Sequence, residues 1–198
     1  DGINVSGGAD SSGTGGPAGM GGGGGMGGEE TFTADAETFL LVSGGTLTVD
    51  AGGDGLDSNG SISITGGTTT VDGPTDGGNG AIDANSGVEV SGGVLVAAGS
   101  AGMAVSPAAS SPQASTMVVF DGVQPAGTTV SLVAEDGTVV ASYTPAKSFQ
   151  TVVFSTPDLV AGATYTITSG GTVSGDEVDG LVLGGTLSGS TDAGSVTV

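Results

Sequence analysis

The sequence contains no cysteine, no histidine and no tryptophan, and its only basic side chain is Lys147. Without cysteine, the chain has neither disulfides nor thiolate metal ligands. Without histidine, it cannot assemble the Ser/His/Asp or Cys/His systems that activate a nucleophile. These absences exclude the corresponding classes of nucleophilic enzyme.

Basic charge is almost lacking as well: 21 acidic side chains oppose one lysine, which gives a formal net charge of −20. Nucleic acids and anionic membranes bind basic patches, so neither is expected as a partner. We also expect no membrane insertion, because no apolar run is long enough. So acidic a chain needs dispersed charges or bound cations to stay compact. Abundant threonine and serine with almost no lysine predict an extracellular or cell-surface protein.

Helical patterns are missing too. No apolar repeat of period 3.6 occurs, and the 43 glycines among 198 residues do not follow the Gly-X-Y spacing of collagen. The glycines fall instead between alternating runs rich in valine, isoleucine and threonine, which favour strands. The sequence therefore predicts an all-β fold.

Three stretches of the chain repeat one another, at residues 43–58, 65–84 and 91–106. Each contains a small hydroxyl residue, a Gly-Gly pair, a short alternating strand and a glycine-rich corner. The pairs begin at Gly44, Gly66 and Gly92, so the steps are 22 and 26 residues. A repeat of this size, built from strands and glycine corners, predicts a stacked parallel β-solenoid over residues 1–112.

The glycine corners align as four successive coils, at Asp1-Gly2-Ile3, Asp54-Gly55-Leu56, Asn79-Gly80-Ala81 and Ala101-Gly102-Met103. The intervals between them are 53, 25 and 22 residues. The first is long because a glycine-rich insertion at about residues 9–36 separates two coils. This insertion is either a flexible loop or a segment that packs against a neighbouring subunit. Because the first corner begins in mid-pattern, we expect further coils upstream.

Alternation along the strands assigns side chains to the two faces of each strand. The residues expected to point inward are Val42, Leu47, Val49, Leu56, Ile62, Ile64, Val71, Ile82, Val88, Val90, Leu95 and Val96. Threonines at 46, 48, 68 and 70 are expected to point outward.

The pattern changes in the second half. Residues 113–198 contain alternating strands separated by turn signals, with a hairpin predicted at Glu135-Asp136-Gly137. We interpret this region as a small strand-rich module. Because Asp179-Gly180-Leu181 repeats the corner motif, it stays open whether the chain rejoins the solenoid after residue 170.

Oxygen ligands cluster in the corners. The candidate metal ligands are Asp54, Asp57, Asn59, Asp72, Asp76, Asn79, Asp83 and Asn85. A coil rise of about 4.8 Å would bring Asp54 close to Asn79 and Asp57 close to Asp83. Calcium takes six to eight hard oxygen ligands and suits such corners better than magnesium. The alternative is that Asp-Gly and Asn-Gly simply form turns.

Catalysis is not expected. Solenoid lyases abstract a proton with a basic residue, usually arginine, and the chain has none. Glycosidases need two carboxylates, one of them buried and protonated, whereas aspartates in glycine corners should be solvated and ionised. A flat aromatic platform for sugar is also missing, since there are two tyrosines and five phenylalanines. An acidic glycan held through bridging calcium is physically easier.

Three long runs carry a resemblance to a known family: GGDGLDSNGSISITGGTTTVDGPTDGGNGAID, SGGVLVAAGSAGMAVSP and TPAKSFQTVVFSTPDLVAGATYTITSGG. They resemble the C-terminal part of a family of bacterial cell-surface carbohydrate-binding proteins, first characterised as a clostridial cellulose- and acid-sugar-binding protein. The resemblance implies a right-handed parallel β-helix with bound calcium, displayed outside the cell, that binds polysaccharide without catalysis. It makes ligands of Asp54, Asp57, Asp72, Asp76 and Asp83.

A second function is consistent with the same pattern. A solenoid has two open ends of unpaired backbone, which invite end-to-end stacking unless they are capped. The chain could therefore be a structural subunit that self-assembles into an extracellular filament or matrix fibre. The insertion at 9–36 discriminates between the two, because burial against another chain would favour the polymer.

Overall fold

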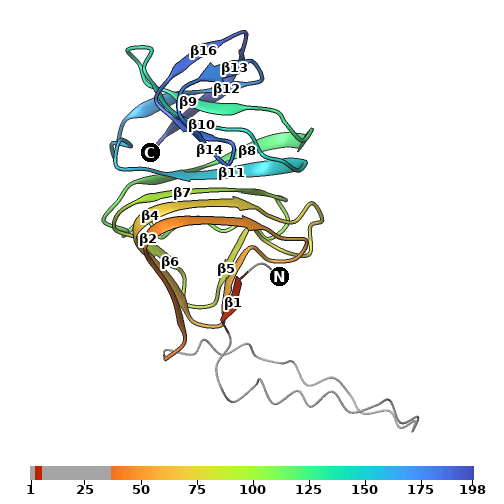
Figure 1. Cartoon of the computed structure of the whole chain (residues 1–198), viewed down its shortest axis with the longest axis vertical. Helices are drawn as coiled ribbons and strands as arrows, with labels where there is room; N and C mark the ends of the chain where they lie inside the picture. The colour runs from red at the N-terminus through yellow and green to blue at the C-terminus, as the bar shows by residue number, and fades with distance from the viewer. Residues whose placement is uncertain (1–2, 6–36) are drawn as a thin grey trace, which may run out of the picture.

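The computed structural model of this chain describes residues 3–5 and 37–198, and every regular element in them is a β-strand (Figure 1). The prediction of an all-β fold is confirmed for this part of the chain. Within it there is also no helix of the length and apolarity needed to cross a membrane. The insertion at about residues 9–36 lies outside the described residues.

The N-terminal half is made of parallel strands. They are β1 (Ile3–Val5), β2 (Phe39–Asp50), β3 (Leu56–Ser58), β4 (Ser61–Asp72), β5 (Ile82–Ala84), β6 (Val88–Val90) and β7 (Val94–Gly99). One sheet has the order β1-β3-β5, and a second begins β2-β4-β7, with β6 also pairing with β4. In Figure 1, β2, β4 and β7 lie side by side, and the shorter strands lie below them.

The register of these strands follows the glycine repeat. Thr46 pairs with Thr68, and Thr68 pairs with Val94, so the steps are again 22 and 26 residues. Ile3 pairs with Leu56, which reproduces the 53-residue interval across the insertion. The spacing of the Gly-Gly pairs therefore predicted which strands pair and in which register.

One corner alignment was wrong. Leu56 pairs with Ile82, a step of 26 residues, so Asp54 lies opposite Gly80 and not opposite Asn79. The apolar match decides this register, because both Leu56 and Ile82 are fully buried. At the fourth corner, residues 101–103 form no strand, although Gly102 lies directly against the backbone of Gly77.

Apolar side chains of the parallel strands fill a single core. Its fully buried members include Leu56, Ile62, Ile64, Val71, Val88, Val90 and Leu95. Stacked positions carry similar side chains: Ile62 pairs with Val88 and Ile64 with Val90. Among the residues predicted to point inward, Leu47 alone is half-buried. Burial of stacked valine and isoleucine is the main term that stabilises this half.

The C-terminal half consists of antiparallel strands. They are β8 (Ser115–Gln124), β9 (Val130–Val133), β10 (Val139–Tyr143), β11 (Phe149–Ser155), β12 (Thr164–Ser169), β13 (Thr172–Ser174), β14 (Glu177–Val178), β15 (Leu181–Leu183), β16 (Thr186–Ser188) and β17 (Thr191–Thr197). The predicted hairpin at 135–137 joins β9 to β10. Six strands form a sheet of order β14-β15-β10-β9-β12-β17.

One sheet runs through both halves. Strand β11 pairs with β7 and with β8, which extends the parallel strands into a five-stranded sheet, β2-β4-β7-β11-β8. A second core fills the space between this sheet and the six-stranded one, with Tyr143, Phe149 and Phe154 among its members. Leu95 points into the first core and its neighbour Val96 into the second, so β7 is buried on both faces.

The segment after residue 170 pairs within the C-terminal half. Strands β14 and β15 extend the six-stranded sheet beside β10, and β17 covers its other edge beside β12. Strands β13 and β16 pair with each other in a separate hairpin. The return to the parallel strands that the corner motif at 179–181 left open is therefore not made by strand pairing in the described residues.

Thr69 offers a test of the first core. Its side chain is fully buried in β4, and its hydroxyl has no hydrogen-bond partner within the described part of the chain. An unpaired buried hydroxyl costs about 1–3 kcal/mol, and valine has nearly the same shape. We expect Thr69→Val to stabilise the protein by about 1 kcal/mol, measured by denaturant unfolding. The matched exposed change Thr46→Val should have almost no effect, and a loss of stability in Thr69→Val would contradict this account of the core.

Candidate functional site

Two aspartates stack on neighbouring parallel strands at the corner of the N-terminal half. Asp57 lies in the middle of β3 and Asp83 in the middle of β5, and the two are paired in register. Neighbouring strands are about 4.8 Å apart. Asp54 lies just before β3, and its Oδ1 accepts a hydrogen bond of 2.7 Å from the amide of Gly80. The predicted approach of Asp57 to Asp83 is therefore present.

The electrostatics of this corner disfavour ionised carboxylates. Partial burial, and then the nearby carboxylates of Asp54 and Asp83, raise the pKa of Asp57. Burial and then Asp54 likewise raise the pKa of Asp83. Like charges on adjacent strands repel one another, and a bound cation between them would relieve that repulsion.

The other corner residues serve local turns. Asp76 lies in the exposed loop after β4, where its Oδ1 accepts hydrogen bonds from the amide of Gly78 and the side chain of Asn79. Asn59 and Asn85 directly follow β3 and β5, and the Asn85 amide donates to the carbonyl of Ser58 at 3.1 Å. These asparagines therefore continue the ladder of Asp57 and Asp83, whereas Asp76 and Asn79 stabilise a separate loop.

Asp72 belongs to a different group, at the junction of the two halves. Its Oδ1 accepts hydrogen bonds from the Tyr143 hydroxyl at 3.0 Å and from the Ala146 amide at 3.2 Å. Burial raises the pKa of Asp72, and these two donors counteract the rise. Burial, with Asp72 beside the ring, also raises the pKa of the Tyr143 phenol. With its carboxylate engaged in this way, Asp72 is left out of the calcium ligands proposed below.

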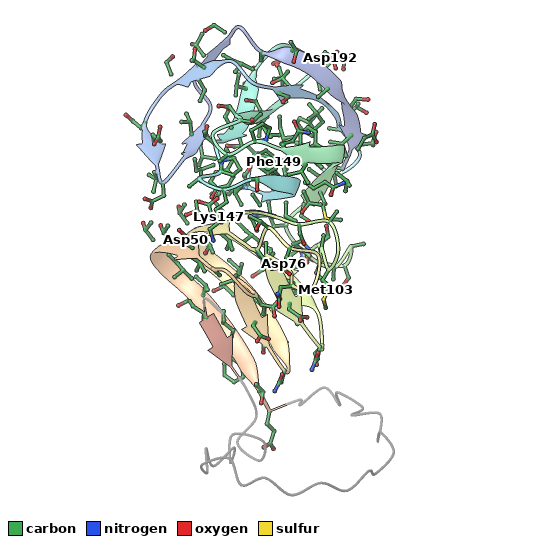
Figure 2. The ribbon with its side chains drawn as sticks, turned by 90° about the vertical axis from the view of Figure 1, so that its right-hand side faces the viewer. Asp50, Asp76, Met103, Lys147, Phe149 and Asp192 are labelled. Atoms are coloured by element: carbon green, nitrogen blue, oxygen red, sulfur yellow. The ribbon has the colours of Figure 1, made fainter. Side chains whose placement is uncertain are left out.

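The single lysine of the chain completes this junction. Lys147 forms an ion pair with Asp50, and its ammonium donates to the carbonyls of Ala51 at 2.7 Å and Asp72 at 3.2 Å. Figure 2 shows Asp50 and Lys147 next to each other where the N-terminal strands meet the C-terminal half. Asp50 and Asp72 are paired in register on β2 and β4, so one ammonium lies beside two stacked carboxylate residues.

Sequence reasoning assigned no role to Asp50 or Lys147. The signal was available in the composition, because a lone cation among 21 acidic residues is favoured beside carboxylates wherever the fold permits it. What the sequence does not contain is the position of the loop after β10 relative to the ends of β2 and β4. That position depends on the sheet that β7 and β11 share.

The corner supplies part of a calcium shell. Within residues 3–5 and 37–198, no group of three or more His, Cys, Asp or Glu side chains is arranged to hold a metal ion. A cation at this corner would therefore use the carboxylates of Asp57 and Asp83 and take its remaining ligands from backbone carbonyls, asparagine oxygens and water. Calcium accepts such mixed shells, whereas metals that need three fixed side chains do not fit.

The raised pKa values predict how stability depends on pH. For Asp57, Asp72 and Asp83, the pKa in the folded state lies above the unfolded value of 3.8. Protonation therefore favours the folded state, and this contribution is complete below pH 3.8 and is lost as the pH rises through the folded values. In chelator, we expect a higher melting temperature at about pH 4.5 than at about pH 7. The triple variant Asp57→Asn/Asp72→Asn/Asp83→Asn should lose most of the difference; an equal difference would contradict the assignment.

Comparison of the chain with protein families, with curated proteins and with solved structures finds no match. The candidate site accordingly depends on the geometry and chemistry described above.

Proposed function

We propose that this chain is an extracellular, calcium-binding and polysaccharide-binding surface protein without catalytic activity, and that its N-terminal half is a short right-handed parallel β-helix. The observation that supports it most directly is the in-register pair Asp57 and Asp83 on β3 and β5. Their raised pKa values indicate that the ionised pair is strained at neutral pH without a counterion. Calcium would supply that counterion and stabilise the corner.

Support for the β-helix comes from the strand register. Two sets of parallel strands, β1-β3-β5 and β2-β4-β7, share the same 26-residue step between their last two members. A chain that visits the same strands in the same order at a constant step is expected to wind as stacked coils. The sequence resemblance points to the same architecture.

Support for a non-catalytic protein comes from the position of the carboxylates. A glycosidase places its two carboxyl groups on either side of a bound sugar, whereas Asp57 and Asp83 lie side by side on one sheet. Four grooves of about 470 to 890 Å³ are lined by other residues. The stacked pair thus suits a shared cation better than a scissile bond.

Binding assays test the proposal directly. Purified protein should bind insoluble cellulose or soluble polygalacturonate in calcium, and chelator should reduce binding at least tenfold. The variant Asp57→Asn/Asp83→Asn should behave in calcium as the wild type does in chelator. A matched control is Asp121→Asn/Asp176→Asn, since both of these aspartates are exposed and lie in neither ladder. Equal binding of neither polysaccharide in both conditions would overturn the proposal.

A second candidate function is a subunit of an extracellular filament, and strand β2 favours it. This twelve-residue strand is an edge of the five-stranded sheet, with β4 on one side and no described strand on the other. Phe39 and Leu41 on it are 60% and 53% exposed. A long edge with exposed apolar side chains can pair with another chain. Electron microscopy in calcium and in chelator tests this: regular filaments support it, and dispersed particles in both conditions overturn it.

A further inference from the structure

Two adjoining grooves run along the outer face of β12. One groove of about 890 Å³ is lined by residues that include Val160, Thr164 and Thr166. The next, of about 710 Å³, is lined by residues that include Thr166, Thr168 and the β16 segment. Ala134, Glu135 and Thr166 line both grooves, so the two are continuous. Each volume is in the range of ligand sites.

The face of β12 that lines these grooves is a row of hydroxyls. Tyr165 and Ile167 point into the second core, so the alternate residues Thr164, Thr166 and Thr168 lie on the opposite face. Four residues of strand span about 13 Å. Strand β16 and its flanks add the side chains of Thr186, Ser188 and Ser190 to the second groove. An extended, polyhydroxylated ligand matches this shape and chemistry.

One of these hydroxyls is unsatisfied. Thr168 is 9% exposed, lines the second groove, and its Oγ1 has no hydrogen-bond partner among the described residues. A buried hydroxyl without a partner is costly, and native structures usually explain one by a ligand, a water or an ion. Strand β17 has a bulge opposite Ile167 and Thr168, a feature found beside binding sites.

The charges of the groove select a neutral ligand. Glu135 lines both grooves and Asp136 lines one, and no basic side chain lines either. The only lysine of the chain is paired with Asp50 at the junction of the halves. Carboxylates accept strong hydrogen bonds from sugar hydroxyls but repel the carboxylates of uronic acids. Val160, 60% exposed at the rim, offers an apolar contact for a sugar ring.

We propose that the groove along β12, from Thr164 to Thr168 with Glu135 at its centre, binds a neutral polysaccharide. This proposal rests on the polysaccharide-binding function proposed above and places the sugar site in the C-terminal half. It separates two roles: the corner of Asp57 and Asp83 holds the cation, and the β12 face holds the glycan. Binding of a neutral glycan at this face then needs no cation between ligand and protein.

The test is isothermal titration of the full chain, in calcium, with neutral gluco-, xylo- and manno-hexaoses and with an oligogalacturonate of equal length. We expect one neutral hexaose to bind and Thr168→Val and Thr166→Val each to weaken it roughly tenfold, the cost of leaving one ligand hydroxyl unpaired. Thr168→Val should keep or raise the melting temperature, because it removes an unpaired buried hydroxyl. A purely structural role for Thr168 would move the melting temperature alone. The exposed change Thr46→Val is the matched control.

Glu135→Gln tests the selection against acidic sugars. It should retain binding of the neutral hexaose within a few-fold and increase any binding of oligogalacturonate, because the repelling charge is gone. Neutral binding that survives both threonine changes would overturn the β12 site while leaving the proposed function intact. If the wild type binds none of these sugars in calcium, both the site and the proposed function are overturned.

Discussion

Replacing Gly93 by alanine is expected to destabilise the protein by about 4 kcal/mol, the sum of a left-handed backbone and an overpacked contact. Gly93 has a φ of +81°, which residues with a Cβ rarely adopt. A Cβ at this position would also lie 2.6 Å from the carbonyl carbon of Gly66 and the carbonyl oxygen of Gly67, one coil below. Neither obstacle can relax easily, because the close atoms belong to the backbone of a paired strand.

The repeat supplies matched controls for this prediction. Gly45 is the equivalent glycine of the first described coil, with a φ of +79° but no atom within 4 Å of an added Cβ. Gly45→Ala should therefore cost only the conformational part, about 1–2 kcal/mol. Gly44→Ala, with open space and no positive φ, should cost almost nothing. Denaturant unfolding measures all three, and equal losses at Gly45 and Gly93 would contradict the stacking of the coils.

Replacing Lys147 by methionine should destabilise the protein by about 2 kcal/mol. Removing one partner of a fully buried ion pair costs roughly 3–5 kcal/mol, and this pair is less buried, since the side chains of Lys147 and Asp50 are 27% and 68% exposed. The loss goes beyond a surface ion pair, because the ammonium also bonds to the carbonyls of Ala51 and Asp72. Methionine keeps the length of the side chain and removes only its charge and donors.

A double-mutant cycle isolates the charge effect. If the ammonium stabilises the stacked carboxylates, Asp50→Asn should rescue part of the loss in Lys147→Met, so the two changes should cost less together than their sum. The exposed change Asp121→Asn is the control and should add independently. A loss below about 0.5 kcal/mol in Lys147→Met would place this pair among ordinary surface contacts and contradict its role at the junction.

The glycine spacing predicted the pairing of the parallel strands from the sequence. Positive φ values and missing Cβ atoms recur at Gly67 and Gly93, where stacked backbones approach one another. This is a local requirement, so it is visible in the sequence as a Gly-Gly pair. The corner Asn79-Gly80-Ala81 misled, because similar letters suggested a 25-residue step, whereas burial of Leu56 against Ile82 fixes 26.

The second core could not be predicted in the same way. Thr70 was expected to point to solvent, yet it is 1% exposed, because the C-terminal half covers the outer face of β4 near the junction. Leu95 and Val96 were both predicted inward, and each is buried in a different core. Alternation identifies two faces of a strand but not what covers the second, which depends on contacts between residues far apart in the chain.

The site was predicted to a similar extent. Asp57 and Asp83 stack as the repeat indicated, because they share a position in the coil. Asp72 was grouped with them by closeness in sequence, but it lies at the end of a different strand and bonds to Tyr143. The groove along β12 carries no motif, since threonines on alternate positions are common in any exposed strand.

The central claim is that the stacked carboxylates of Asp57 and Asp83 hold calcium, and calcium titration at pH 7 tests it most directly. Heat of binding and melting temperature should be measured together for the wild type, Asp57→Asn/Asp83→Asn and Asp121→Asn/Asp176→Asn. We predict that the wild type and the exposed control bind calcium and gain about 2.7 kcal/mol of stability at a hundredfold excess over Kd. The corner variant should lose both effects. Calcium binding that is absent from the wild type, or that persists unchanged in Asp57→Asn/Asp83→Asn, would contradict the claim.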